Sequence, residues 1–162
     1  MSTGTNLHDT EDELQWRPIG GALADHRRVL VVDDYADAAD ALQWLLNANG
    51  FECRAMHDAQ DVCAIAGAWQ PFAVVLDIAM PGLDGLELAR RLRAAPSTSH
   101  MLLIACTGCA SQRDRERARE AGFDAHCAKP LTPQRLLALL TQAVSGAPDG
   151  RVNMKGDQRR EV

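Results

Sequence analysis

Three aspartates follow two apolar stretches of this sequence, at the points where the stretches end. Asp33 and Asp34 come directly after residues 29–32, and Asp77 comes directly after residues 72–76. Both stretches are typical of strands buried on both faces of a parallel sheet, and parallel strands end at the same edge. Three carboxylates at one edge repel one another, and a hard divalent cation with oxygen ligands relieves that repulsion. The residues therefore predict a magnesium site.

A hydroxyl and an ammonium group follow two later apolar stretches in the same way. Thr107 follows residues 101–106, and Lys129 follows residues 124–128. These groups would hydrogen-bond and neutralise phosphate oxygens at the edge that carries the acids. Together the side chains predict phosphoryl transfer onto a carboxylate. Taken one at a time, the same residues have simpler explanations. Asp33-Asp34 could be a solvated turn before a helix, where acidic residues are favoured. Lys129 could be an ordinary surface lysine, and Thr107 a strand-end hydroxyl without a role.

Expected strands and helices alternate along the chain and would bring these side chains together. The expected strands are residues 29–32, 51–56, 72–78, 101–106 and 124–128. The expected helices are the stretch that ends at Gly50 and residues 59–69, 83–94, 112–121 and 133–144. Five strand–helix units in series predict an α/β fold, with one parallel, doubly wound sheet between two layers of helices.

The composition disfavours several classes of function. A formal net charge of -5 and a pI near 5.5 do not suit a nucleic-acid-binding surface, which is ordinarily basic. No apolar stretch is long enough to span a bilayer, and the first residues lack the pattern of a signal peptide, so we expect a cytoplasmic protein. The five cysteines are scattered and odd in number, so reduced thiols are expected rather than a disulfide scaffold.

The chain is expected to hold one domain with a polar segment at each end. Residues 28–145 have the size of one domain. Residues 1–27 are expected to form a polar extension outside the core; Thr10–Glu13 has capping-box spacing, but a short helix there is the less favoured reading. Residues 146–162 are expected to form a flexible tail. No DNA-binding helix-turn-helix fits after Val144, so we expect the output to leave through the surface of the domain itself.

Four motifs, taken together and in order, resemble the receiver domain of two-component response regulators. They are residues 29–34 (VLVVDD), residues 74–85 (VVLDIAMPGLDG), Thr107-Gly108 and Lys129-Pro130. The resemblance covers about residues 28–144. Within this family, the chain is similar to single-domain, chemotaxis-type regulators. It implies a flavodoxin-like fold: five parallel strands in the order 2-1-3-4-5, five helices and a three-layer α/β/α arrangement.

The resemblance also implies a role for each motif. Asp77 would accept a phosphoryl group from a phosphohistidine on a sensor histidine kinase or a histidine phosphotransfer protein. Lys129 would bind the acyl phosphate, and Thr107 would hydrogen-bond it and carry the switch to the surface, with Gly108 and Pro130 as supporting residues. The implied Mg²⁺ ligands are the side chains of Asp33, Asp34 and Asp77 and the backbone carbonyl of Ala79.

Three positions depart from the commonest receiver pattern. His126 stands where many receivers have the tyrosine or phenylalanine that moves behind the threonine, and a histidine there could also titrate and make the output depend on pH near neutrality. A half-buried strand residue is the favoured reading of His126. Ala79 and Cys109 occupy positions that help to set the phosphoryl lifetime in related proteins. Since neither orients an attacking water well, we expect slow self-hydrolysis.

The resemblance implies signalling rather than turnover of an external substrate. The phosphorylated protein would bind a downstream protein target or pass the phosphoryl group along a relay, and it would catalyse only its own phosphorylation and dephosphorylation. Residues 112–144 contain the surface through which many receivers form homodimers. The helix expected at residues 112–120 alternates positive and negative side chains, for which a solvated face is the simpler reading.

Two other functions are compatible with parts of the sequence. Cys106 and Cys109 form a Cys-x-x-Cys motif, and Cys127 is expected on the neighbouring strand, which would suit redox control or zinc. Zinc usually needs a second paired motif, which the sequence lacks. A pseudo-receiver that binds partners without phosphate is disfavoured, because no expected acidic, threonine or lysine position is missing.

Overall fold

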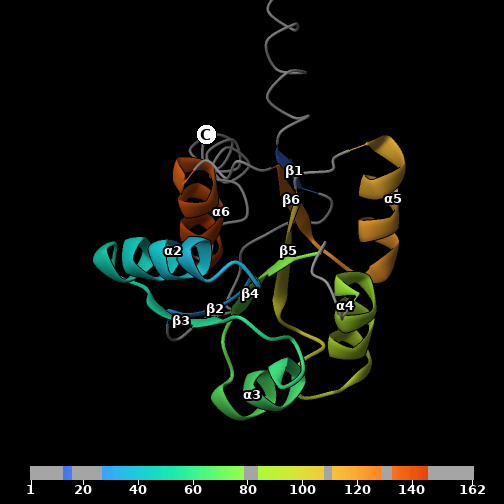
Figure 1. Cartoon of the computed structure of the whole chain (residues 1–162), viewed down its shortest axis with the longest axis horizontal. Helices are drawn as coiled ribbons and strands as arrows, with labels where there is room; N and C mark the ends of the chain where they lie inside the picture. The colour runs from blue at the N-terminus through green and yellow to red at the C-terminus, as the bar shows by residue number, and fades with distance from the viewer. Residues whose placement is uncertain (1–12, 16–26, 79–83, 108–110, 129–132, 146–162) are drawn as a thin grey trace, which may run out of the picture.

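Strands and helices alternate along the chain. The computed structural model describes residues 13–15, 27–78, 84–107, 111–128 and 133–145 (Figure 1). The strands are β1 (Glu13–Gln15), β2 (Arg28–Val32), β3 (Glu52–Met56), β4 (Ala73–Asp77), β5 (Leu102–Thr107) and β6 (Ala125–Ala128). The helices are α2 (Ala36–Ala48), α3 (Val62–Trp69), α4 (Gly85–Ala94), α5 (Gln112–Ala121) and α6 (Pro133–Ser145).

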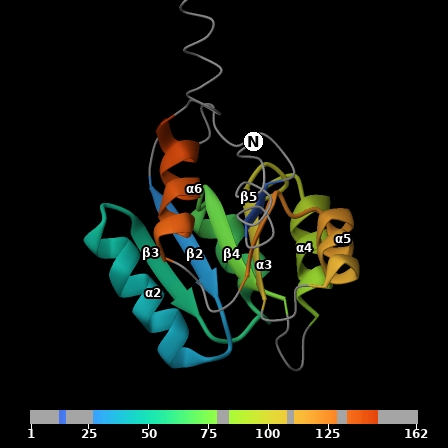
Figure 2. The same ribbon diagram turned by 90° about the horizontal axis from the view of Figure 1, so that it is seen from above.

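Strands β2 to β6 form a parallel sheet in the order β3-β2-β4-β5-β6. Numbered among themselves, these five strands have the order 2-1-3-4-5, so the predicted flavodoxin-like arrangement with five helices is confirmed. Figure 2 shows β2 and β4 side by side in the middle of the sheet. A helix connects each strand to the next, because parallel neighbours require a crossover connection.

The helices cover both faces of this sheet. Helices α2 and α6 lie on one face, and α3, α4 and α5 lie on the other (Figure 1). Strand β2 illustrates how the residues divide: Val29 and Val31 pack in the core next to α2 and α6, whereas Leu30 and Val32 pack in the core on the opposite face. Since both faces are buried, every position of the strand is apolar, which explains the continuous apolar runs in the sequence.

A sixth strand extends the sheet. Residues Glu13–Gln15 form β1, which pairs antiparallel with β6 at the edge of the sheet. The sequence predicts an extension outside the core for these residues, with a short helix from the capping box as the less favoured reading. Glu13, the last residue of that capping box, is instead part of a strand; the rest of the capping box lies outside the described residues. Backbone pairing with β6 therefore overrides the local helix signal.

Local sequence signals set the ends of several helices. Asp84 accepts a hydrogen bond from the backbone N–H of Leu86, and Ser111 accepts one from the backbone N–H of Asp114, so both residues are N-caps. Helix α4 ends before Pro96, as predicted. Across the described ranges, the helices are all too short or too polar to cross a membrane.

Candidate functional site

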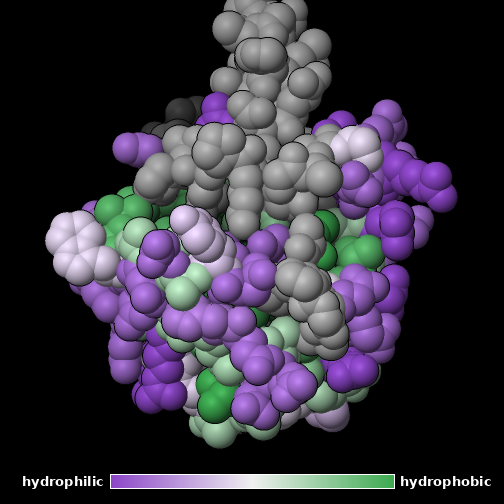
Figure 3. Space-filling view, viewed as in Figure 1, coloured by the Kyte–Doolittle hydropathy of each residue, from purple (hydrophilic) through white to green (hydrophobic). Residues whose placement is uncertain are grey.

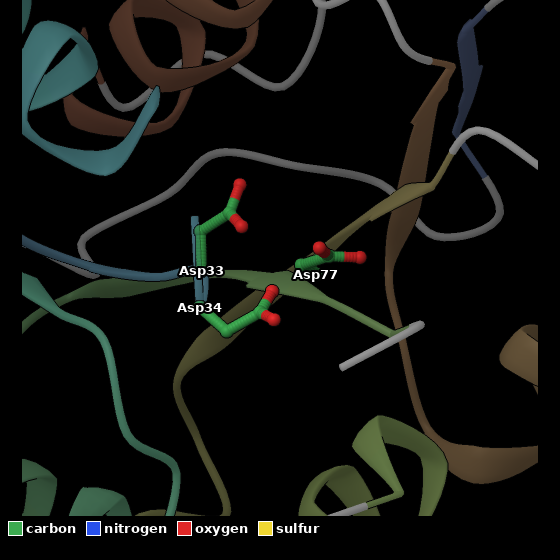
Figure 4. Close-up of side chains that lie close together, drawn as sticks. All are labelled: Asp33, Asp34 and Asp77. Atoms are coloured by element: carbon green, nitrogen blue, oxygen red, sulfur yellow. The ribbon is translucent and has the colours of Figure 1, made fainter. Parts of the chain in front are cut away.

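The three aspartates predicted to hold a metal meet at the carboxyl-terminal ends of the central strands. Asp33 and Asp34 follow β2, and Asp77 is the last residue of β4. Because Val32 is the register partner of Leu76 in the parallel pair β2–β4, the residues that follow both positions lie side by side. One carboxylate oxygen from each aspartate lies within 4.8 Å of those from the other two. Figure 4 shows the three side chains gathered around a common space.

A turn between β2 and α2 orients Asp33. Its backbone N–H donates to the carbonyl of Met56 at 3.0 Å, which continues the pairing between β2 and β3 beyond the strand. One side-chain oxygen of Asp33 accepts a hydrogen bond from the backbone N–H of Tyr35, also at 3.0 Å. This Asx-type turn fixes the carboxylate just before the N-terminus of α2, where negative charge is favourable.

Asp77 is held by close packing at the end of β4. It is the register partner of Cys106 in β5, and the backbone N–H of the next residue, Ile78, donates to the carbonyl of Cys106 at 3.2 Å. Helix α4 begins directly against this point: a Cβ added to Gly85 would lie 2.5 Å from Cα of Ile78 and 3.1 Å from the carbonyl oxygen of Asp77. Only glycine fits there. Gly85 is the last residue of the 74–85 motif, but no separate role was predicted for it, although the Asp-Gly pair at the start of a helix is a usable signal.

The donor set fits a hard divalent cation. Asp33 and Asp77 are only 8% and 7% exposed, whereas Asp34 faces solvent. Water therefore solvates two of the three charges poorly, and their mutual repulsion is strong at short range. All three donors are carboxylate oxygens, which suit Mg²⁺ better than zinc. Such an ion would be bound at the ends of β2 and β4, with two buried carboxylate ligands and one, Asp34, that is exposed to solvent.

The remaining predicted residues follow strands that end at the same edge. Thr107 is the last residue of β5 and the register partner of Ala128, the last residue of β6. The backbone therefore brings the ends of β2, β4, β5 and β6 to one side of the sheet, as predicted. The side chain of Thr107 lies outside the described part of the chain, as do the residues Ala79, Gly108, Cys109, Lys129 and Pro130.

His126 is fully buried rather than half-buried. Its neighbours Ala125 and Cys127 pack toward α2 and α6, so the alternation along β6 places the His126 side chain on the face covered by α5. Burial lowers the pKa of His126, and the positive charge of Arg115 on α5 lowers it further. The imidazole is therefore neutral at neutral pH, and its titration moves below the near-neutral range considered from the sequence.

The structure places Cys106 beside Cys127 on the neighbouring strand. Cys106 and Cys127 are register partners on β5 and β6, and both are buried among apolar side chains. Within the described ranges, the aspartate cluster is the only group of three or more acidic, histidine or cysteine side chains arranged to hold a metal. Buried thiols pack as small apolar residues and are poor nucleophiles, so this arrangement gives no support to zinc and little to redox control. Cys109 lies outside the described part.

One family model matches most of the chain. The model described as the response regulator receiver domain covers residues 29–141. An uncharacterised 14.6 kDa protein from the sodA1 3′ region of Leptolyngbya boryana is 34% identical over 114 residues, which are 70% of this chain and 87% of that protein. The response regulator MprA of Mycobacterium avium (strain 104) is 35% identical over 111 residues, which are 68% of this chain. The match covers 48% of MprA, so the chain spans about half the length of that relative.

Solved structures of the same kind superpose on the chain. A CheY-like response regulator receiver domain protein from Methanospirillum hungatei JF-1 has a TM-score of 0.69 and 26% identity, and the match covers 75% of this chain and 95% of that one. A putative response regulator from Chloroflexus aurantiacus J-10-fl also has a TM-score of 0.69 and 26% identity, with 75% of this chain and 99% of that chain covered. These likenesses agree with the arrangement of β2 to β6.

Proposed function

Because this chain belongs to the response regulator receiver family, we propose that it works as a single-domain response regulator in a two-component phosphorelay and that Asp77 accepts the phosphoryl group. The observation that carries the proposal is the convergence of three carboxylates within 4.8 Å at the end of the central strands. Asp77 is the acceptor because it ends β4, between β2, which leads to the other two acids, and β5, which ends in Thr107. Asp33 is instead oriented by its own turn.

The proposed reaction is a transfer from a phosphohistidine to a carboxylate. A carboxylate oxygen of Asp77 attacks the phosphorus atom, and the new P–O bond forms as the P–N bond breaks. The electron pair of the broken bond remains on the imidazole nitrogen of the donor. The product is an acyl phosphate on Asp77, and the donor histidine returns to its unphosphorylated form.

The residues around Asp77 are proposed to bind the ion and the transferred group. Mg²⁺ would be held by the carboxylates of Asp33, Asp34 and Asp77 and by the backbone carbonyl of Ala79, and it supplies positive charge beside the phosphoryl oxygens when bound. Lys129 binds the acyl phosphate through its ammonium group, and Thr107 donates a hydrogen bond to it. The register of Thr107 with Ala128, which precedes Lys129, supports this assignment.

The acyl phosphate is proposed to be long-lived. Self-hydrolysis requires a water that is aligned with the phosphorus, and side chains at positions 79 and 109 are the ones that we expect to align it. Alanine at position 79 has no polar group, and the cysteine thiol at position 109 is a weak hydrogen-bonding partner. A slow decay would suit an output that depends on the phosphorylated state persisting.

The proposed partners are proteins at both ends of the transfer. A sensor histidine kinase or a histidine phosphotransfer protein supplies the phosphoryl group, and a downstream protein binds the phosphorylated form or takes the group onward. The chain modifies itself and turns over no external substrate. The acidic overall charge supports protein partners rather than nucleic acid, and we place this exchange in the cytoplasm.

Intact-mass measurement after incubation with acetyl phosphate and Mg²⁺ tests the assignment of Asp77. The wild-type protein should gain the mass of one phosphoryl group, and Asp77→Asn should gain none. Asp84→Asn is the matched control, because Asp84 caps α4 near the site but does not belong to the carboxylate cluster, and asparagine caps helices equally well. Equal phosphorylation of Asp77→Asn and wild type would overturn the proposal, and the decay of the wild-type peak after removal of acetyl phosphate measures the lifetime.

A further inference from the structure

The two outer strands of the parallel sheet differ in their protection against pairing with another chain. Strand β3 lies at one edge and carries the exposed charges of Glu52 and Arg54 within five residues. Strand β6, at the opposite edge of the parallel set, has the sequence Ala-His-Cys-Ala, and its histidine is buried and neutral. Charged residues and proline are the usual devices that keep an edge strand from pairing with another copy. Strand β6 contains none of them.

Strand β1 supplies the missing protection. It pairs with β6 through three register pairs, Glu13 with Cys127, Leu14 with His126 and Gln15 with Ala125. Figure 1 shows β1 beside β6, between α6 and α5. The new edge strand reads Glu-Leu-Gln, so it brings a charged and a polar residue to an edge that would otherwise be neutral. The N-terminal segment thus serves as the cover of β6.

We propose that β1 is an edge guard, and that its release lets the β6 strands of two copies of this chain pair antiparallel across a two-fold axis. A two-fold axis perpendicular to the strand makes the same strand of two copies run antiparallel, and antiparallel pairing is the geometry that β6 already accepts from β1. The two sheets would then become one continuous sheet. This inference does not depend on the phosphorylation of Asp77.

The charges on the surface beside β6 are compatible with the approach of a second copy of the chain. Helix α5 exposes Arg113, Glu116, Arg117 and Glu120, so it presents both signs along one helix. Figure 3 shows hydrophilic residues over the position of α5, at the upper right of that view. A two-fold axis through the β6 edge would place this helix beside its own copy, and a surface that carries both signs is able to complement itself.

The connection between β1 and β2 favours pairing of β1 with β6 of the same chain. Gln15 lies opposite Ala125, the first residue of β6, and Arg28 is the first residue of β2, so both ends of the connection lie at the same end of the sheet. Four strand spacings separate them, about 19 Å in total, whereas the connecting residues reach about 40 Å when extended. A covalent connection of this length keeps β1 near its own β6 at an effective concentration on the order of millimolar. A second copy therefore pairs there only when β1 is disabled.

Proline substitution in β1 tests the proposal in the full-length chain. Backbone N–H groups of a strand point alternately toward and away from the partner, so prolines at two adjacent positions remove at least one N–H that faces β6. The test variant is Leu14→Pro/Gln15→Pro, and the matched control is Leu14→Ala/Gln15→Ala, which keeps both N–H groups. Sedimentation velocity over a range of concentrations should show monomers for the wild type and the alanine control, and a shift to the dimer mass for the proline variant.

A proline variant that stays monomeric at every concentration would overturn the proposal, and so would a wild-type protein that dimerises as strongly as the variant. Hydrogen exchange separates dimerisation from unfolding. In the wild type, the amides of β6 should exchange slowly; fast exchange there would also contradict a guarded edge. In the proline variant, β6 amides should exchange faster at low protein concentration and slow down as the concentration rises, whereas amides of the central strand β4 stay protected throughout. Loss of protection in β4 would instead indicate global unfolding.

Discussion

At the scale of single residues, Asp34 differs from the two aspartates that it faces. Asp33 and Asp77 are buried, and Asp34 is exposed, so the cluster is open to solvent on one side. An ion entering from water would meet Asp34 first, because its carboxylate is the one that solvent reaches. Without an ion, the charge of Asp34 adds to the repulsion between the other two.

Magnesium is expected to stabilise the folded protein through this cluster. A ligand that binds only the folded state adds about 2.7 kcal/mol at a hundred times its dissociation constant. Thermal unfolding of the wild type should therefore shift to higher temperature with added Mg²⁺. Asp34→Asn should raise the melting temperature without Mg²⁺, because repulsion is relieved, and should shrink the shift with Mg²⁺. Asp37→Asn, an exposed acid in the first turn of α2, is the control; equal Mg²⁺ shifts in all three proteins would contradict the cluster as the metal site.

His126 is expected to make the protein less stable as the pH falls. Its pKa in the folded chain lies below the ordinary value of 6.5, because the side chain is buried and faces Arg115. As the pH falls through that ordinary value, the unfolded chain binds a proton that the folded chain does not, so the free energy of unfolding decreases until the pH reaches the lowered pKa. Urea unfolding at several pH values should show a weaker decrease for His126→Phe.

The control for His126 is an exposed histidine. His100 lies on the surface, and urea unfolding of His100→Gln at the same pH values shows how much replacing an exposed histidine changes the result. If His126→Phe and the wild type lose stability in parallel as the pH falls, His126 is not the group responsible.

At the scale of elements, the contact between α4 and the end of β4 determines the position of Asp77, the proposed acceptor. Gly85→Ala should lower the stability and slow the phosphorylation of Asp77, since the new Cβ would lie 2.5 Å from the backbone of Ile78 and force α4 away from β4. Gly67→Ala is the matched control: in α3 the added Cβ meets only Ser97, at an ordinary 3.6 Å, and alanine favours the helix by about 0.5–1 kcal/mol. Urea unfolding and the rate of phosphoryl uptake measure both effects, and similar behaviour of the two variants would contradict the tight contact.

A second junction ties α4 to the beginnings of β5 and β6. The guanidinium of Arg93 donates to Asp124 at 2.6 Å and to the backbone carbonyls of Met101 and Gly122 at 2.7 and 2.8 Å. The Asp124 carboxylate also accepts from the backbone N–H of Leu103 at 2.9 Å. This network lies at the beginnings of β5 and β6, whereas the aspartate cluster lies at the carboxyl-terminal ends of the strands. It fixes α4 against the sheet.

Asp124→Ala is expected to reduce the free energy of unfolding by about 3 kcal/mol, because it leaves the charge of Arg93 without its carboxylate partner in a largely buried setting. Glu87→Ala, on the same helix, removes exposed ion pairs with Arg90 and Arg91 and should cost only about 0.5 kcal/mol. Urea unfolding of both variants measures the difference. Equal costs would mean that the Arg93 network contributes no more than a surface pair.

At the scale of the whole molecule, the proposed phosphoacceptor and the edge that we propose β1 to protect lie in different parts of one sheet. Asp77 ends the central strand β4, whereas β1 lies beyond β5 and β6. The Leu14→Pro/Gln15→Pro variant should therefore take up phosphate from acetyl phosphate at the wild-type rate, as followed by intact mass. A lost or much slower uptake would show that β1 supports the site as well as the edge.

The parallel sheet and the meeting of the three aspartates could be predicted from the amino-acid sequence. Continuous apolar runs followed by Asp33, Asp77 and Thr107 are local features, and the order of strands and helices follows from a pattern that neighbouring residues carry. Parallel strands share one edge, so the meeting of the acids was predictable without coordinates. The strand order itself came from the family resemblance rather than from the pattern.

Features that depend on contacts between distant segments could be seen only in the folded structure. Strand β1 has three residues and no apolar pattern, and it exists because β6 offers it backbone partners more than a hundred residues away. Other features arise in the same way: the burial of His126, the close approach of Gly85 to Ile78, the position of Cys106 beside Cys127, and the ion pair of Arg93 with Asp124. Each depends on which surfaces the folded chain brings together, and a residue type in a linear sequence does not carry that information.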